Sequence, residues 1–208
     1  MTMRSLPVLQ AKAPQKERVD PRSVRLSLTD RCDLACIYCR PDKQDGYYES
    51  TLDLGAFRTL LRGLADGGVR RVRITGGEPL LSPLVVDAVR VIRDLGFEDV
   101  ALTTNATRLA KLAAPLKEAG LQRINVSLDT LVPERFSRLT RGGRLGPVLE
   151  GIAAAREVGF AERKLNVVVV RGENDGELPE LAQFAWENGM TPRFLEVMAI
   201  GEGAKIQD

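Results

Sequence analysis

Strand-like and helical patterns alternate along this chain, and the helical patterns share a common ending. They stop at five glycines, each followed by an apolar residue, namely Gly68, Gly96, Gly120, Gly159 and Gly189. A glycine after the last helical turn, followed by an apolar residue, is the usual chemistry of a helix C-cap. The alternation repeats with a period of very roughly 30 residues. It therefore predicts an α/β fold with a parallel sheet.

Six segments are expected to be strands, with five helices between them. The strands are expected at 24–30, 69–76, 99–105, 123–129, 164–170 and 193–198. The helices are expected from Leu54, from the Ser82–Pro83 pair and around Leu109, and then near residues 147–158 and 177–188. The chain ends ten residues after the sixth expected strand, so a sixth full helix is not expected.

Each expected strand has an apolar side and a polar side, whereas buried parallel strands usually read as continuous apolar runs. We therefore expect a partial (β/α)6 barrel of TIM-like type, with a wet interior and without its last helix. The alternative is a solvated face on an open α+β sheet. The polar side includes Arg25, Arg73 and Lys164, with Arg71 and Arg123 as further candidates. Such a cavity favours an anionic ligand, most simply phosphates.

The length, charge and amino-acid composition of the chain exclude several classes of function. The 208 residues allow one domain, and the net charge of +2 gives no signature of nucleic-acid binding. There is no histidine, which removes Ser-His-Asp triads and Cys/His zinc fingers. No apolar stretch is long enough to span a membrane. Residues 1–21 are polar without a signal-peptide core, so we expect a flexible lead-in to a cytoplasmic core at 22–208.

The three cysteines of the chain, Cys32, Cys36 and Cys39, lie directly after the first expected strand. Loops at the carboxyl ends of barrel strands carry active sites. An odd number of closely spaced cysteines does not suit a disulfide scaffold. Three thiolates without a fourth Cys or His leave an open coordination position, which is typical of a reactive metal centre. A zinc site completed by Asp33 or another carboxylate is the alternative.

The spacing C-x3-C-x2-C, with the aromatic Tyr38 before the third cysteine, resembles the radical S-adenosylmethionine (SAM) superfamily. The resemblance implies a [4Fe–4S] cluster on the three cysteines, whose fourth iron binds SAM. One electron from a donor then cleaves SAM to a 5′-deoxyadenosyl radical, so the reactive species comes from the cofactor and not from a catalytic side chain. The turn Gly76-Gly77-Glu78-Pro79 resembles the GGE motif that contacts the SAM amino group, although alone it reads equally well as a tight turn.

Longer blocks between residues 22 and 204 resemble the MoaA-type GTP 3′,8-cyclases of molybdenum cofactor biosynthesis, which are lyases. They include RLSLTDRCDLACIYC, VRRVRITGGEPLL, LQRINVSLDTL and PRFLEVMAIGEG. The resemblance implies SAM contacts at Tyr38, Gly77, Ser127 and Met198, and GTP contacts at Arg25, Arg73, Thr103 and Lys164. Met198 taken alone reads more simply as a core residue. The implied reaction is hydrogen abstraction from the GTP ribose C3′, followed by attack on guanine C8.

The chain departs from that family mainly at its end. The family carries a second three-cysteine set whose cluster binds guanine, but no cysteine follows Cys39 here. Smaller departures are Arg40 in place of Met and Asn105-Ala106 in place of Asn-Gly. We expect either a fragment or a shortened relative that generates the radical. The alternatives are a radical SAM enzyme for another nucleotide or phosphorylated substrate, and an inactive cluster-binding module. The sequence leaves the electron donor and the oligomeric state open, with a homodimer as one option.

Overall fold

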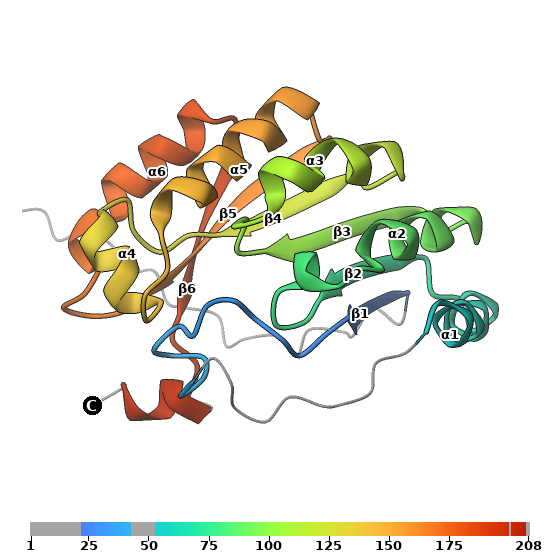
Figure 1. The fold of residues 1–208 in the computed structure, drawn as a ribbon, viewed down its shortest axis with the longest axis horizontal. Helices are drawn as coiled ribbons and strands as arrows, with labels where there is room; N and C mark the ends of the chain where they lie inside the picture. The colour runs from blue at the N-terminus through green and yellow to red at the C-terminus, as the bar shows by residue number, and fades with distance from the viewer. Residues whose placement is uncertain (1–21, 43–52, 200, 207–208) are drawn as a thin grey trace, which may run out of the picture.

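The computed structural model describes residues 22–42, 53–199 and 201–206. It contains one sheet of six parallel strands in the order β1-β2-β3-β4-β5-β6. The strands are β1 Ser23–Ser27, β2 Arg71–Thr75, β3 Asp99–Thr104, β4 Arg123–Ser127, β5 Glu162–Val169 and β6 Thr191–Glu196. Each strand pairs only with its neighbours in sequence, so β1 and β6 are the open edges (Figure 1). The predicted fold class, a partial (β/α)6 barrel, is confirmed.

Over the ranges that the structure describes, six α-helices and three 3₁₀ turns accompany the strands. The helices are α1 Leu54–Asp66, α2 Val85–Asp94, α3 Leu109–Glu118, α4 Pro133–Leu139, α5 Leu145–Val158 and α6 Leu178–Glu187. The 3₁₀ turns are η1 Pro79–Leu81, η2 Asp175–Glu177 and η3 Gly201–Lys205. Figure 1 shows α2, α3, α5 and α6 on one side of the sheet. The other side is therefore the one that carries the polar face of the strands.

Two helix predictions differ from the structure. Helix α2 begins at Val85 rather than at the Ser82–Pro83 pair, because Ser82 ends η1 and its hydroxyl accepts a hydrogen bond from the Leu84 amide at 3.3 Å. Helix α4 was not predicted. Its seven residues are too few to give a clear helical period, although its Pro133 at the first turn is a typical start signal.

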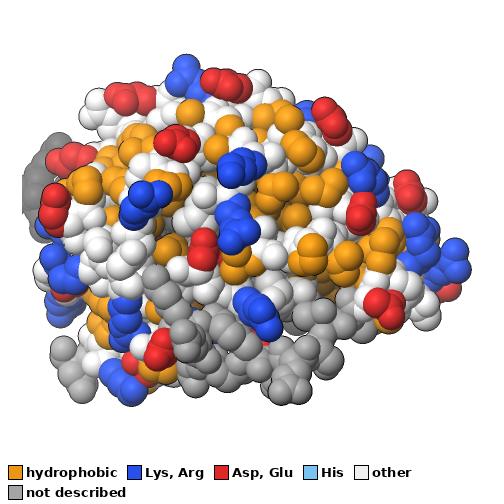
Figure 2. Space-filling view, viewed as in Figure 1, with side chains coloured by type: hydrophobic (Ala, Val, Ile, Leu, Met, Phe, Trp, Pro, Cys, Tyr) orange, Lys and Arg blue, Asp and Glu red, His pale blue; other side chains and the backbone are white. Residues whose placement is uncertain are grey.

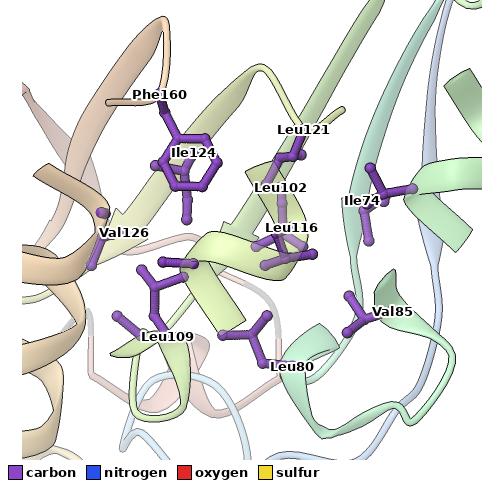
Figure 3. Packing of buried hydrophobic residues seen from close by; sticks show 14 of the residues in the cluster. Ile74, Leu80, Val85, Leu102, Leu109, Leu116, Leu121, Ile124, Val126 and Phe160 are labelled. Carbon is purple, nitrogen blue, oxygen red and sulfur yellow. The ribbon is translucent and has the colours of Figure 1, made fainter. Parts of the chain in front are cut away.

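The apolar sides of the strands form the core with the helices. Figure 3 shows Ile74, Leu102 and Ile124 of the sheet packing toward Leu109 and Leu116 of α3. All five of these side chains are fully buried. Their strand neighbours on the opposite side, such as Arg73 and Thr103, are only partly buried. The alternation in the sequence therefore separated the helix-facing side from the polar side correctly.

The last strand is less covered than the others. Phe194 is 43% exposed and Leu195 is 37% exposed on β6. A groove of about 680 Å³ runs beside them, lined by Val169, Arg171 and Ile206 among others. This open strand corresponds to the expected barrel without its last helix.

The face of the molecule seen in Figure 2 has no single dominant charge. Figure 2 shows Lys and Arg side chains interspersed with acidic ones over the face in view. Within the described residues, none of the helices combines the length and the apolarity that crossing a bilayer requires. The expected lead-in at 1–21 lies outside the described residues, so its flexibility and the boundary at residue 22 stay predictions.

Candidate functional site

The cysteine loop, residues 28–42, leaves the carboxyl end of β1 and is fixed against the end of α4. The Ala35 amide donates a hydrogen bond to the Thr140 carbonyl at 3.2 Å, and the Ile37 amide donates to the Leu139 carbonyl at 2.9 Å. The side chain of Leu34, next to Ala35, is buried. Figure 1 shows this loop in blue, running toward α4 and η3. The backbone that carries the thiols is therefore held by the fold itself.

The three thiols differ in exposure. Cys32 and Cys36 are half-buried, while Cys39 is exposed. The amides of Cys39 and Arg40 both donate to the Cys36 carbonyl, at 2.8 and 3.2 Å, which forms a turn between the second and third cysteines. The three cysteines lie within eight residues of one another on this loop, so their side chains leave one short stretch of backbone.

Burial controls the protonation of two of these thiols. It raises the pKa of Cys32 to about 11 and the pKa of Cys36 to about 12. The nearby carboxylates of Asp33 and Asp129 add to the increase. Without a cationic partner both groups therefore remain neutral thiols at physiological pH, and a metal centre would have to displace their protons.

The donor set fits an iron–sulfur cluster. Within the described residues, no three His, Cys, Asp or Glu side chains converge on one point as ligands of a single ion do. A [4Fe–4S] cluster binds each thiolate through a different iron, so its sulfurs need not converge. Three neighbouring thiols on a fixed loop, at the edge of the sheet where barrel active sites lie, match that requirement.

The GGEP turn after β2 lies directly against the cysteine loop. The Gly77 amide donates to the Thr29 carbonyl at 2.7 Å, and the Glu78 amide donates to the Arg31 carbonyl at 2.7 Å. A Cβ atom on Gly77 would overlap the carbonyl oxygens of Asp30 and Arg31. A residue without a side chain is therefore required here for the two loops to approach each other.

Glu78 connects the loops after β2 and β3. Its side chain is buried and accepts hydrogen bonds from the Leu80 amide at 2.9 Å, the Thr104 hydroxyl at 2.7 Å and the Asn105 amide at 2.6 Å. Burial raises the pKa of Glu78 to about 7, and the three hydrogen bonds oppose that increase. Both carboxylate oxygens are engaged within the protein. The sequence singled out the motif but not this cross-link.

A second set of hydrogen bonds joins the loop after β3 to the cysteine loop. The Asn105 side-chain amide donates to Asp33 Oδ1 at 2.8 Å and lies 3.8 Å from Cys32 Sγ. The Thr107 hydroxyl donates to Asp33 Oδ2 at 2.7 Å. Ala106, between them, has a φ of 63°, which is the left-handed conformation that favours glycine. Sequence reasoning assigned no role to Asp33 beyond the zinc alternative, or to Thr107.

Tyr38 joins the cysteine loop to the end of β4. Its hydroxyl donates to Asp129 Oδ2 at 2.5 Å, and Asp129 Oδ1 accepts from the Val168 amide at 2.8 Å. Burial raises the pKa of Asp129 to about 6, although both hydrogen bonds oppose the increase. Sequence reasoning named Tyr38 but missed Asp129 as its partner.

The segment after β6 returns to the cysteine loop. A Cβ atom on Gly203 would lie 3.3 Å from the Tyr38 carbonyl oxygen, so η3 packs closely on this loop. Arg141 and Glu202 form an ion pair at 4.0 Å beside it. Met198, just before η3, is 72% exposed, so the interpretation as a core residue was wrong. Ser127, the last residue of β4, is partly buried.

The polar face of the sheet groups the four expected GTP contacts into two pairs. Arg25 and Arg73 are register neighbours on β1 and β2. Within the described part of the chain, neither side chain has an ion pair or a hydrogen bond. Thr103 and Lys164 are aligned on either side of Asn125, whose amide donates to the Thr103 hydroxyl at 3.3 Å.

Carboxylates accompany the cations on this face. Lys164 Nζ lies 2.8 Å from Glu162, and Arg123 pairs with both Glu162 and Asp99. The two basic side chains lower the pKa of Glu162. Arg25 and Arg73 therefore supply the unpaired positive charge, while Lys164 and Arg123 are already neutralised. Sequence reasoning counted the cations but left out these two acids.

Comparisons with known proteins find relatives of this chain. A profile of the Radical SAM superfamily matches residues 26–185. The GTP 3′,8-cyclase of Limosilactobacillus fermentum is 47% identical over 181 residues, which are 86% of this chain and 54% of that protein. The GTP 3′,8-cyclase of Lactiplantibacillus plantarum is 45% identical over 185 residues, 88% of this chain and 56% of that protein. The chain spans about half the length of these curated relatives.

Solved structures share the fold. Streptococcus suis SuiB bound to S-adenosylmethionine superposes with a TM-score of 0.78 at 22% identity, over 90% of this chain and 43% of that one. HydG, a maturase of the [FeFe]-hydrogenase, gives a TM-score of 0.69 at 18% identity, over 89% of this chain and 45% of that one. The thiol loop, the GGEP turn and the matched profile lie on one continuous stretch of the chain. The chain belongs to the Radical SAM superfamily.

Proposed function

We propose that this chain is the radical-generating core of a GTP 3′,8-cyclase, a lyase that forms the first intermediate of molybdopterin synthesis. The observation that carries the proposal is the 47% identity to a GTP 3′,8-cyclase over 86% of the chain. That region includes the thiol loop, the GGEP turn and the polar sheet face. Because the chain spans about half of that relative, the complete reaction is proposed for the longer protein.

Cys32, Cys36 and Cys39 would hold one [4Fe–4S] cluster, and Tyr38, Gly77, Ser127 and Met198 would contact SAM. When bound, the cluster and SAM together supply the one-electron chemistry that yields the 5′-deoxyadenosyl radical. The protein holds the thiol loop in place through Tyr38–Asp129 and through the backbone bonds to α4. These contacts fix the thiols before the cofactors bind.

Arg25, Arg73, Thr103 and Lys164 would bind and orient GTP on the polar face. Unpaired guanidinium groups suit phosphate oxygens, because the planar fork of a guanidinium donates two hydrogen bonds to one phosphate group. The guanidinium groups of Arg25 and Arg73 are already unpaired. Lys164 must exchange Glu162 for the ligand, so its contribution to binding is smaller. Orientation of the ribose before the radical forms is what these side chains would supply.

The remaining parts of the proposal concern partners. An external one-electron donor would reduce the cluster. The protein would act in the cytoplasm, with a homodimer as its candidate oligomeric state. Neither nucleic acid nor membrane takes part. In the longer relatives, further chain would cover the exposed β6 side, where Phe194 and Leu195 lie open.

The substrate is tested with GTP deuterated at C3′. Anaerobically reconstituted and reduced protein is incubated with SAM, and the 5′-deoxyadenosine formed is analysed by mass spectrometry. The proposal predicts that GTP stimulates 5′-deoxyadenosine formation and that deuterium appears in the product. Stimulation by another nucleotide but not by GTP would show a radical SAM enzyme with a different substrate. An absence of 5′-deoxyadenosine from cluster-loaded protein would favour an inactive cluster-binding module.

A further inference from the structure

We propose that Asn105 is a positioning residue that donates a hydrogen bond to the sulfur of Cys32 and thereby raises the reduction potential of the bound cluster. The inference rests on the proposed cluster ligation by Cys32, Cys36 and Cys39. It adds a residue that sets how readily the cluster takes up an electron.

The orientation of the Asn105 side chain is determined by its neighbours. Its oxygen accepts a hydrogen bond from the Thr107 amide at 3.0 Å and lies 2.8 Å from the Thr107 hydroxyl oxygen, whose single proton goes to Asp33. A backbone N–H can only donate, so the atom facing Thr107 must be the oxygen. The NH₂ group therefore faces the opposite way, toward Asp33 Oδ1 at 2.8 Å and Cys32 Sγ at 3.8 Å.

The backbone of Asn105 is held as firmly as its side chain. Its amide donates to Glu78 Oε2 at 2.6 Å, and Glu78 is itself buried and bonded to Leu80 and Thr104. The Asn105 side chain is partly buried, as is the Cys32 thiol. Asn105 therefore presents its NH₂ group to the sulfur without the conformational cost of ordering a free side chain.

Donation to a ligand sulfur favours the reduced cluster. One-electron reduction makes the cluster and its thiolates more negative, and the electron comes from an external low-potential donor. An N–H group that points at a ligand sulfur stabilises that added charge, so the potential rises. Partial burial strengthens the effect, because less water screens it. Asn105 and Thr107 also donate to the Asp33 carboxylate, which otherwise opposes reduction.

The test compares the wild type with N105A, N105D and T107V. T107V is the matched control, because it removes the Thr107 hydroxyl yet keeps the Thr107 amide that orients Asn105. Each protein is reconstituted anaerobically, its iron content is measured, and the cluster is titrated with dithionite while its EPR signal is recorded. This readout does not depend on turnover.

The expected order of potentials is wild type, T107V, N105A and then N105D as the most negative. Loss of one hydrogen bond to a charged sulfur lowers the equilibrium constant for reduction about tenfold in N105A. For a one-electron couple this is a shift of about 59 mV. N105D adds a negative charge beside the sulfur, because Asp has nearly the same shape as Asn but carries a carboxylate. It also provides the comparison if N105A does not retain a cluster.

Two results would overturn the inference alone: clusters with the same potential in the wild type and the Asn105 variants, or a T107V shift as large as that of N105A. The second would show that Asn105 only stabilises the loop. A wild-type protein that binds no cluster would overturn the proposed function together with this inference. The iron content therefore separates the two failures.

Discussion

The hydroxyl of Tyr38 donates a 2.5 Å hydrogen bond to the carboxylate of Asp129, which lies 91 residues further along the chain. Tyr38 stands between two of the candidate cluster ligands, and Asp129 follows β4. This bond therefore ties the thiol loop to the middle of the sheet. Because Asp129 also accepts from the Val168 amide, the connection extends to β5.

Replacing Tyr38 with Phe should destabilise the metal-free chain by about 1–3 kcal/mol, since a buried carboxylate loses one of its donors. Denaturant unfolding under reducing conditions measures the loss. The control is a double-mutant cycle with D129N, which should show a coupling free energy of about 1 kcal/mol or more. Additive effects of the two substitutions would mean that the bond contributes nothing.

Stability should increase as the pH falls from about 7 toward 4. Burial raises the pKa of Glu78 to about 7 and that of Asp129 to about 6 in the folded protein. Both groups then bind protons more tightly when folded than when unfolded, where their pKa values are near 4. The resulting stabilisation is complete below the unfolded values and is lost as the pH rises through the folded ones.

The size of this effect is up to about 3 kcal/mol for each group. Urea unfolding of the metal-free protein between pH 4 and 8 would reveal it, and E78Q and D129N should each flatten the profile. Stability that decreases steadily over the same acidic range in the wild type would contradict the assigned burial of these carboxyls.

Replacing Gly77 with Ala should displace the cysteine loop and reduce cluster loading severalfold. The new Cβ would overlap the carbonyl oxygens of Asp30 and Arg31, which are backbone atoms that cannot move aside alone. Iron content after reconstitution is the measurement. Gly176 provides the control, since a Cβ there meets nothing within 4 Å. Equal iron content in G77A and G176A would show that the close approach of the two loops at Gly77 is not needed for cluster binding.

Replacing Gly151 with Ala should destabilise the packing of α5 on α3. A Cβ at Gly151 would overlap the Ala106 carbonyl oxygen and lie 3.0 Å from Leu109 Cβ, whereas a Cβ at Gly146 on the same helix meets nothing within 4 Å. G151A should therefore unfold about 1–3 kcal/mol more easily than G146A. Comparable thermal stability of the two variants would be inconsistent with this close helix contact.

The strands were predictable because their alternation reports the fold directly. On β2, Val72 and Ile74 are buried, whereas Arg73, which lies between them in the sequence, is only partly buried. This period of two residues follows from strand geometry alone. The thiol loop was also easy to find in the sequence, since all three candidate ligands lie in one short stretch. Helix α4 was missed because seven residues carry little periodic signal.

The contacts that support the site could not be predicted in the same way. Glu78 meets Thr104, and Asp33 meets Asn105, only because the carboxyl ends of parallel strands share one edge of the sheet. The pairing of Lys164 with Glu162 could have been predicted from the sequence, since residues two apart on a strand share a face. It was missed because only the cations were counted.

The central claim is that the thiol loop holds a cluster that cleaves SAM. Chromatography of 5′-deoxyadenosine, formed from SAM by anaerobically reconstituted and dithionite-reduced protein, tests it most directly, with C36A as the control. The account predicts 5′-deoxyadenosine from the wild type and none from C36A, together with the loss of the cluster absorbance in that variant. Fully loaded wild-type protein that forms no 5′-deoxyadenosine, or full cluster absorbance in C36A, would contradict it.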